Sequence, residues 1–297
     1  MRTLILNSDN IVEGTNNSIL EYEFAGGNIN LKKGQKVALA NLQMYYSTFN
    51  ITALNNNNSF SYVWVDGTTN VVSIPNGFYD IAGLNNFLHF TMVQNKHYLL
   101  SGSSFVYLMT LGVNPTLYSA EVNCFGVSVA LAATNTWTLP AGATWVLPTN
   151  FIVPELLVGA NNFGLVIGFA AGFYPNSVIA GTPPAQTQTP AFTTDQQILS
   201  SFTPQVTPVS SFIITCSLIN NNYAVPNNLM YSFSPQGTIG GQFTIAPNQY
   251  VFINVLPAQY NRFQVSFIDQ DYNPVAIQDP NMIIQLVISD VEDFTGV

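Results

Sequence analysis

Residues 261–288 read NRFQVSFIDQDYNPVAIQDPNMIIQLVI. Apolar and polar residues alternate in the first part of this segment, and it ends in an almost continuous apolar run. Alternation with a period of two is typical of a half-buried β-strand, whereas a short run that is apolar on both faces is typical of a strand covered on both sides. The segment therefore predicts two strands, 263–268 and 282–288.

The same patterns occur on both sides of a different central region. Before it they predict strands at 20–24, 37–46, 60–64, 71–74, near 98 and at 105–111. After it they predict strands at 212–219, 230–233, 250–256, 263–268 and 282–288. These segments supply about four and five strong strands, which is enough for the eight strands of a jelly roll.

One substantial helix is expected at residues 80–94. Asp80 can accept backbone N–H bonds as an N-cap, and Ile81, Leu84 and Leu88 follow at helical spacing. Glycine and asparagine within the segment are poor helix formers, so packing must hold this helix.

The middle of the chain has a different composition. Nine of the 17 prolines lie between residues 130 and 208, and residues 181–194 are rich in Thr, Pro, Gln and Ala, which favours an exposed loop. We therefore predict an all-β fold, a single jelly-roll sandwich formed by residues 1–111 and 209–297, with one short helix. Residues 112–208 are expected to form a proline-rich β and loop insertion that projects outward. The alternative is that 122–129 and 165–169 are central jelly-roll strands.

Charged residues make up only 7% of the 297 residues, against about 25% in an ordinary domain. Between Lys96 and Arg262 only Glu121, Glu155 and Asp195 are charged. A folded chain with so few charges indicates a surface that meets other subunits, although abundant Asn, Gln, Ser and Thr can also keep a protein soluble. The net charge of −9 argues against direct binding of nucleic acid, which requires clustered Lys and Arg.

The sequence offers little for membranes or disulfides. Its first residues do not have the pattern of a signal peptide, and the long uncharged stretch 122–154 is broken by Gly, Pro and Asn, so no membrane span is expected. Cys124 and Cys216 each lie beside apolar residues and are expected to be buried free thiols. The sequons at Asn16, Asn50 and Asn57 are expected to stay unmodified.

No motif for catalysis or metal binding stands out. His89 and His97 are eight residues apart, which is too far for chelation of one ion by neighbouring helical turns. Asp269, Asp271 and Asp279 are typical of a turn, and three further acids, at 290, 292 and 293, are typical of a solvated end. We therefore expect no catalytic, cofactor-binding or metal-binding residues, no cofactor, and a protein that is not an enzyme.

Four segments carry a resemblance to a known family. They are ALANLQMYYSTFNITALNNNNSFSYVW (38–64), TTNVVSIPNGFYDIAGLNNFLHF (68–90), NNFGLVIGFAAGFYP (161–175) and NRFQVSFIDQDYNPVAIQDPNMIIQLVI (261–288). In their order and spacing they resemble the penton, or minor capsid, proteins of virophages and polinton-like viruses. The segments cover roughly a third of the chain, and none is chemically diagnostic by itself.

This resemblance implies a structural protein of the virion. It implies a single jelly roll whose homopentamers close the fivefold vertices of an icosahedral capsid, among capsomers of a major capsid protein with a double jelly roll. The protein would be assembled inside the host cell and located at the capsid vertex. The alternative is a carbohydrate- or receptor-binding jelly-roll attachment protein, in which Trp137 and Trp145 could stack on sugars.

Overall fold

A computed structural model describes residues 1–207 and 209–289. The chain divides into two compact units: unit 1 is formed by residues 1–49 and 209–297, and unit 2 by residues 50–208. Among the described residues, strands far outnumber the three short-to-medium α-helices. The prediction of a mostly β protein is confirmed.

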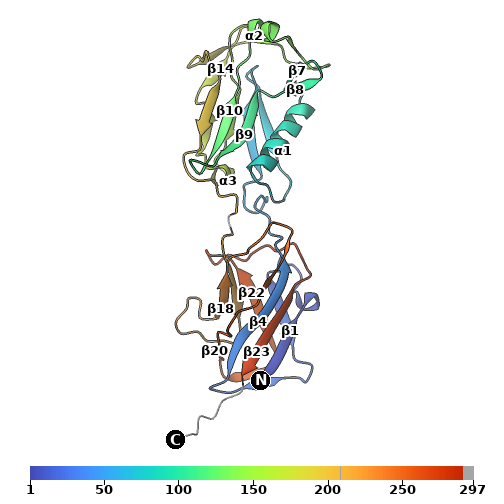
Figure 1. Ribbon diagram of the computed structural model, residues 1–297, viewed down its shortest axis with the longest axis vertical. Coiled ribbons are helices and arrows are strands. Elements are labelled where there is room, and N and C mark those ends of the chain that lie inside the picture. The colour runs from blue at the N-terminus through green and yellow to red at the C-terminus, as the bar shows by residue number, and fades with distance from the viewer. Residues whose placement is uncertain (208, 290–297) are drawn as a thin grey trace. The chain divides into compact units, whose positions relative to one another are not determined.

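Unit 1 is a sandwich of two antiparallel sheets (Figure 1). Its eight main strands are β1 (Arg2–Leu6), β2 (Ile19–Glu23), β4 (Lys36–Tyr45), β17 (Phe212–Cys216), β18 (Leu229–Phe233), β19 (Gln242–Ile245), β22 (Arg262–Ile268) and β23 (Ile283–Ser289). The smaller elements are the 3-10 helix η1 (Ser8–Asn10), β3 (Ile29–Leu31), which pairs with β21 (Ala258–Tyr260), and β20 (Ile253–Asn254), which pairs with β4.

The strand order is that of a jelly roll. One sheet has the order β1-β23-β4-β19, and the other has the order β18-β17-β22-β2. If the eight strands are lettered B to I along the chain, the sheets contain B-I-D-G and C-H-E-F, which is the jelly-roll arrangement. We call them the BIDG sheet and the CHEF sheet. The predicted single jelly roll is confirmed.

The core of unit 1 lies between the two sheets, because alternate residues of each strand point inward. Leu6, Leu42 and Ile284 from the BIDG sheet meet Leu20 and Phe267 from the CHEF sheet, and all five are fully buried. The eight strands therefore enclose one continuous apolar layer.

Unit 2 has four small sheets and its own core. Its strands are β5 (Ser59–Val63), β6 (Thr69–Ser73), β7 (Leu99–Ser101), β8 (Ser104–Val106), β9 (Met109–Asn114), β10 (Ser119–Cys124), β11 (Trp137–Thr138), β12 (Glu155–Val158), β13 (Gly172–Tyr174), β14 (Val178–Ala180), β15 (Thr187–Thr189) and β16 (Gln196–Leu199). They pair as β13-β12-β5-β6, β16-β10-β9, β11-β7-β8 and β14-β15. Its helices are α1 (Ile81–Gln94), α2 (Val129–Thr134) and α3 (Phe163–Ile167).

Helix α1 confirms the predicted helix at 80–94. The Asp80 side chain accepts a hydrogen bond from the Gly83 N–H at 2.6 Å, as an N-cap does. One side of the helix is buried in the core of unit 2. Asn85 Oδ1 also accepts a hydrogen bond from the Leu111 N–H of β9 at 2.8 Å. No helix among the described residues is long and apolar enough to cross a membrane.

The predicted N-terminal limit of the insertion, at residue 112, is wrong. Residues 50–111 belong to unit 2, so only three main jelly-roll strands precede the insertion and five follow it. Alternation indicates that a strand is half-buried but does not say which sheet it joins, so β5, β6 and β9 were indistinguishable from jelly-roll strands. Among the five later strands, β19 was not predicted, because its four residues QFTI give only a short pattern.

Two other expectations need correction. Residues 181–194 are not simply an exposed loop, because β15 pairs with β14 and both Gln186 and Gln188 are buried. Only Ile253–Asn254 forms a strand within 250–256, where Tyr250 and Val251 are exposed. The alternative of central jelly-roll strands at 122–129 and 165–169 also fails: β10 joins a sheet of unit 2, and most of the second segment lies in α3 or follows it.

The chain enters and leaves unit 2 at two points that one side chain connects. Asn50, the first residue of unit 2, is buried, and its Nδ2 donates to the carbonyl oxygens of Tyr79 at 2.7 Å and Val206 at 2.8 Å. Its Oδ1 accepts the Tyr79 N–H at 2.9 Å. The amide therefore holds the entering and the leaving segments of unit 2 together.

We expect Asn50→Ala to destabilise unit 2 by about 2–4 kcal/mol, because it leaves buried backbone groups without hydrogen-bond partners. All three tryptophans lie in unit 2, so tryptophan fluorescence during urea unfolding reports on this unit alone. Asn222→Ala, at an exposed position in unit 1, is the control. An unchanged fluorescence midpoint in Asn50→Ala would contradict this role.

Candidate interaction surfaces

The outer face of the BIDG sheet carries no charged residue over four successive rows of paired residues. The rows are Thr3–Val287–Ala38, Ile5–Gln285–Asn41, Ile283–Gln43–Thr244 and Tyr45–Gln242. The next row, Ser289–Lys36–Asn254, carries the first charge. We call the four uncharged rows the BIDG patch.

The BIDG patch exposes large apolar side chains in this chain. Ile5 is 56% exposed, Ile283 is 43% exposed and Tyr45 is 39% exposed. Polar residues with amide or hydroxyl groups lie beside them on adjacent strands and provide hydrogen-bonding groups without charge, whereas Val287 and Ala38 of the first row are buried. Such a surface is suited to burial against another protein, because its four rows contain no ion to desolvate, and the nearby Asp279 carboxylate, which accepts the Tyr45 N–H, lies at the end of the patch.

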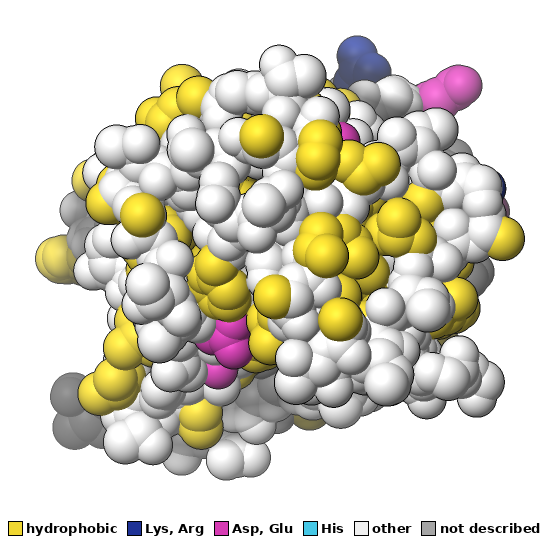
Figure 2. All heavy atoms as spheres, turned by 90° about the horizontal axis from the view of Figure 1, so that it is seen from above, with side chains coloured by type: hydrophobic (Ala, Val, Ile, Leu, Met, Phe, Trp, Pro, Cys, Tyr) yellow, Lys and Arg dark blue, Asp and Glu magenta, His cyan; other side chains and the backbone are white. Residues whose placement is uncertain are grey.

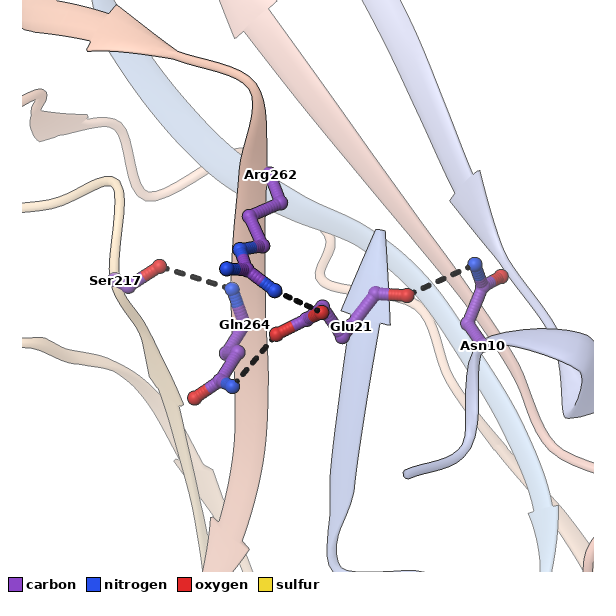
Figure 3. A network of polar contacts seen from close by, with 5 residues as sticks. All are labelled: Asn10, Glu21, Ser217, Arg262 and Gln264. Carbon is purple, nitrogen blue, oxygen red and sulfur yellow. Dashed lines mark hydrogen bonds and ion pairs between the residues drawn. The ribbon is translucent and has the colours of Figure 1, made fainter. Parts of the chain in front are cut away.

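The outer face of the CHEF sheet is different, because it holds a polar network with charges (Figure 3). Arg262 Nη1 lies 3.2 Å from Glu21 Oε1, and Gln264 Nε2 donates to Glu21 Oε2 at 2.8 Å. These hydrogen bonds, from Gln264 and then Arg262, lower the pKa of Glu21. The two outer faces of one sandwich therefore differ in charge.

An open pocket of about 510 Å³ lies over the middle of the CHEF outer face. Its floor includes Ile19, Ser266 and Thr215, which are paired across three strands. Its walls include Val225 from the β17–β18 connection and Tyr272 from the β22–β23 connection, which are 79% and 52% exposed. None of the lining residues is charged.

The surface of unit 2 is also poor in charge. Its 159 positions contain six charged residues: Asp66, Asp80, Lys96, Glu121, Glu155 and Asp195. Phe90, Phe105 and Tyr118 are more than half exposed. Figure 2 looks onto the end of unit 2 near α2 and shows hydrophobic side chains among uncharged surface, with few charged ones.

The two histidines lie in separate packing environments of unit 2. His89 stacks on Tyr107 with ring centroids 3.7 Å apart and hydrogen-bonds the Met109 carbonyl at 3.1 Å. His97 is buried and stacks on Trp64, and its Nδ1 shares a hydrogen bond of 2.8 Å with the Tyr62 hydroxyl. Burial lowers the pKa of His97 to about 4 and lowers that of His89. Both imidazoles are therefore neutral at pH 7.

The acidic turn residues also have structural roles. Asp269 Oδ1 accepts the backbone N–H groups of Asp271 and Asn273, each at 2.9 Å, and Asp279 accepts the Tyr45 N–H at 3.1 Å. The acids at 290, 292 and 293 lie outside the described residues. Within residues 1–207 and 209–289, no group of three or more His, Cys, Asp or Glu could hold a metal ion.

The two cysteines are buried free thiols, as predicted. Burial raises the pKa of Cys216 to about 12 and also raises that of Cys124, so neither is a reactive thiolate at neutral pH. Two of the three sequons are not accessible for glycosylation, because Asn50 and Asn57 are buried and hydrogen-bonded.

The tryptophans do not form a sugar platform. Trp64 and Trp145 are buried, and Trp137 packs against the core of unit 2. The Trp145 Nε1–H donates to the Lys96 carbonyl at 2.7 Å, which fixes the ring inside the unit. Trp145 also joins the apolar cluster around Trp64, so it is not available for the sugar stacking that the carbohydrate-binding alternative requires.

A buried carboxyl group that the sequence does not single out holds part of unit 2 together. Glu155 on β12 is 1% exposed, and its Oε1 accepts hydrogen bonds from Ser177 Oγ and from Gln188 Nε2 at 3.0 Å. Gln188 also bonds both backbone groups of Val153 at 2.9 Å. Ser177 and Gln188 belong to the hairpin β14–β15 or its approach, so this cluster fastens the hairpin to β12.

Burial is the largest influence on Glu155 and raises the pKa of its carboxyl, although the hydrogen bonds from Ser177 and Gln188 act in the opposite direction. The only Lys or Arg in unit 2 is Lys96, whose Nζ donates to the Ala141 carbonyl at 2.9 Å. The hydrogen-bonded cluster around Glu155 therefore contains no Lys or Arg of unit 2 that could balance a charge on the carboxyl. Only the proximity of Gln188 to Glu155 in the fold, and no sequence signal, identifies this group.

Comparisons with solved structures include two likenesses that extend over nearly the whole chain. The mavirus penton protein, in a crystal structure, is 10% identical, with a TM-score of 0.42, over 97% of this chain and 96% of that chain. A chain of the Sputnik virophage, in a cryo-EM structure, is 11% identical, with a TM-score of 0.38, over 100% of both chains. No family model and no curated protein matches the sequence. At these identities and TM-scores, the likenesses do not assign a function to the chain.

We expect the contribution of Glu155 to the stability of unit 2 to fall as the pH rises above about 4.5, whereas the lowered pKa values of His97 and His89 give contributions that grow with pH in the same range. Because the folded-state pKa of Glu155 lies above 4.5, the folded unit holds this proton more tightly than the unfolded chain does. The stabilisation is complete below the unfolded pKa and is lost as the pH rises through the raised folded pKa. Thermal unfolding followed by tryptophan fluorescence between pH 4 and 8 measures this change.

Glu155→Gln keeps the shape of the side chain and removes the ionisation, so its melting temperature relative to that of the wild type should increase between pH 4 and pH 8 and exceed it at pH 7.5. Glu121→Gln, at a partly exposed position of the same unit, is the matched control and should keep the wild-type slope. Equal pH slopes in the wild type and Glu155→Gln would show that Glu155 is not the source.

Proposed function

We propose that this chain is a structural capsid protein that forms homopentameric capsomers at the fivefold vertices of an icosahedral virion. The observation that carries the proposal is the BIDG patch, an uncharged and partly apolar sheet face on a jelly roll whose opposite face bears Glu21 and Arg262. The sequence resemblance to virophage and polinton-like penton proteins supports the same role. This role requires shape and interfaces rather than a reactive group.

Exposure of the BIDG patch in a monomer favours association. Ile5, Ile283 and Tyr45 lie together on one face, and their burial removes apolar area from water, at about 25 cal/mol per Å². Large exposed apolar patches mark protein interfaces. Closed rings of identical subunits satisfy such interfaces completely, and five subunits fit a fivefold vertex.

The remaining partner and the location follow from the same proposal. A vertex capsomer needs neighbours, and we propose a major capsid protein with a double jelly roll in that position. Unit 2, inserted between β4 and β17, is proposed to project outward from the particle. The chain would be located at the capsid vertex after assembly inside the host cell, without direct contact with nucleic acid.

The carbohydrate-binding alternative loses its main support in unit 2. Trp145 is buried and Trp137 packs against the core, so the aromatic rings expected to stack on sugars are not free to do so. Binding of the purified chain to a glycan array would nevertheless favour an attachment protein over the vertex role.

We expect the purified chain to form a particle of about 160 kDa in light scattering, since one chain has a mass of 32.4 kDa. In purified virions, about sixty copies per particle are expected, five at each of twelve vertices. A monomer at assembly-like salt and protein concentration would contradict spontaneous ring formation. A copy number far from sixty would contradict the vertex location.

A further inference from the structure

We infer that neighbouring subunits of the proposed ring meet head to tail, with the BIDG patch of one copy packed over the CHEF pocket of the next copy. The inference rests on the proposed pentamer and names the two surfaces that build it. The occupant of the BIDG patch is thus a second copy of this chain.

Ring symmetry requires two different contact surfaces on each subunit. A ring of five has heterologous contacts, whereas a surface that pairs with its own copy gives closed dimers. In a sandwich the outer faces of the two sheets point in opposite directions. The BIDG patch and the CHEF pocket lie on these two faces, so one chain can present one surface to each of its two neighbours.

The BIDG patch supplies protruding apolar groups and uncharged hydrogen-bonding groups. Ile283 and Ile5 are exposed beside Gln285 and Gln43 on adjacent strands. Each row spans two or three strands about 4.8 Å apart, and the four rows lie about 7 Å apart, which gives a patch roughly 10 Å by 20 Å. The patch by itself is smaller than the roughly 800 Å² that each partner buries in a specific interface, so the loops around it form the rest of the proposed contact.

The CHEF pocket supplies the complementary hollow. Its floor row contains Ile19, Ser266 and Thr215, so it offers apolar surface and hydroxyl groups, and its lining has no charge to desolvate. Val225 and Tyr272 extend its walls outward and are exposed in the single chain. Apolar side chains that protrude from the BIDG patch fit such a hollow.

The charged residues Glu21 and Arg262 of the CHEF face lie beside the pocket rather than in it. Glu21 lies two residues along β2 from Ile19 of the pocket floor, and its ion pair with Arg262 remains satisfied within the subunit. Polar and charged groups are typical of an interface rim, and uncharged groups of its centre. The pocket would therefore be the centre of the contact and the Glu21–Arg262 pair part of its rim.

A charge placed in the BIDG patch tests one side of the contact. Gln43→Lys and Ile283→Lys lie on the outer face, so the monomer should keep its fold, as circular dichroism and thermal unfolding would show. We expect both variants to sediment as monomers under conditions in which the wild type forms a ring. Asn28→Lys, exposed between β2 and β3 in the same unit, is the matched control and should keep the ring.

Cysteine crosslinking tests which surface lies opposite. We expect the double variant Gln43→Cys with Ser266→Cys, treated with a flexible bismaleimide, to give a ladder of up to five chains on a denaturing gel. Each single variant should give none, since the two native cysteines are buried. Dimers from Gln43→Cys alone would overturn the inference, because they would place two BIDG patches face to face. The absence of a ladder in the double variant would overturn the pairing with the CHEF pocket.

The outcomes separate this inference from the proposed function. A wild-type chain that forms no ring contradicts the pentamer itself, and the inference fails with it. A ring that survives Gln43→Lys and Ile283→Lys leaves the pentamer standing and overturns only the assignment of its surfaces.

Discussion

Strand β23, the last described strand of the chain, lies between β1 and β4 in the BIDG sheet. The register runs over five residue pairs with β1 and over seven with β4, so this sheet is closed by segments from opposite ends of the sequence. The rest of unit 1 depends on this pairing, because the inward side chains of β23 complete the core that faces the CHEF sheet. It also requires the 159 residues of unit 2, which lie between β4 and β17, to form a core of their own, and they do so around residues such as Trp64 and Leu88.

Charged residues are scarce in both units, and the two units place them differently. Unit 2 encloses a carboxyl group, Glu155, within a cluster of amide and hydroxyl groups and exposes aromatic residues on its surface. Unit 1 places Glu21 and Arg262 on one sheet and leaves the other face uncharged. In unit 1 the positions of the charged residues therefore say more about possible interfaces than their number does, because they distinguish the two outer faces of one sandwich.

The sequence predicts the elements well where one residue pattern has one physical meaning. Helix α1 follows from the Asp80 cap and the spacing of Ile81, Leu84 and Leu88, and β22 follows from its alternation. The boundary of unit 2 could not be predicted, because alternation in β5 or β9 does not identify the sheet that a strand joins. Strand β15 and the Glu155 cluster were missed for a related reason. Gln186 and Gln188 are polar in sequence, yet their side chains form buried hydrogen bonds across the fold.

The position of unit 2 in the chain has a consequence for biosynthesis. Ribosomes add about 5–20 residues per second, so the 159 residues of unit 2 separate the appearance of β4 from that of β17 by roughly 10–30 s. During this time β1, β2 and β4 have no partner from the C-terminal part of the chain, and their backbone edges are open to other nascent chains. Charged residues are present on these early strands, with Glu21 and Glu23 on β2 and Lys36 on β4. Charges on unpaired strands oppose edge-to-edge aggregation, so these residues protect a jelly roll that cannot close until its last strand has been made.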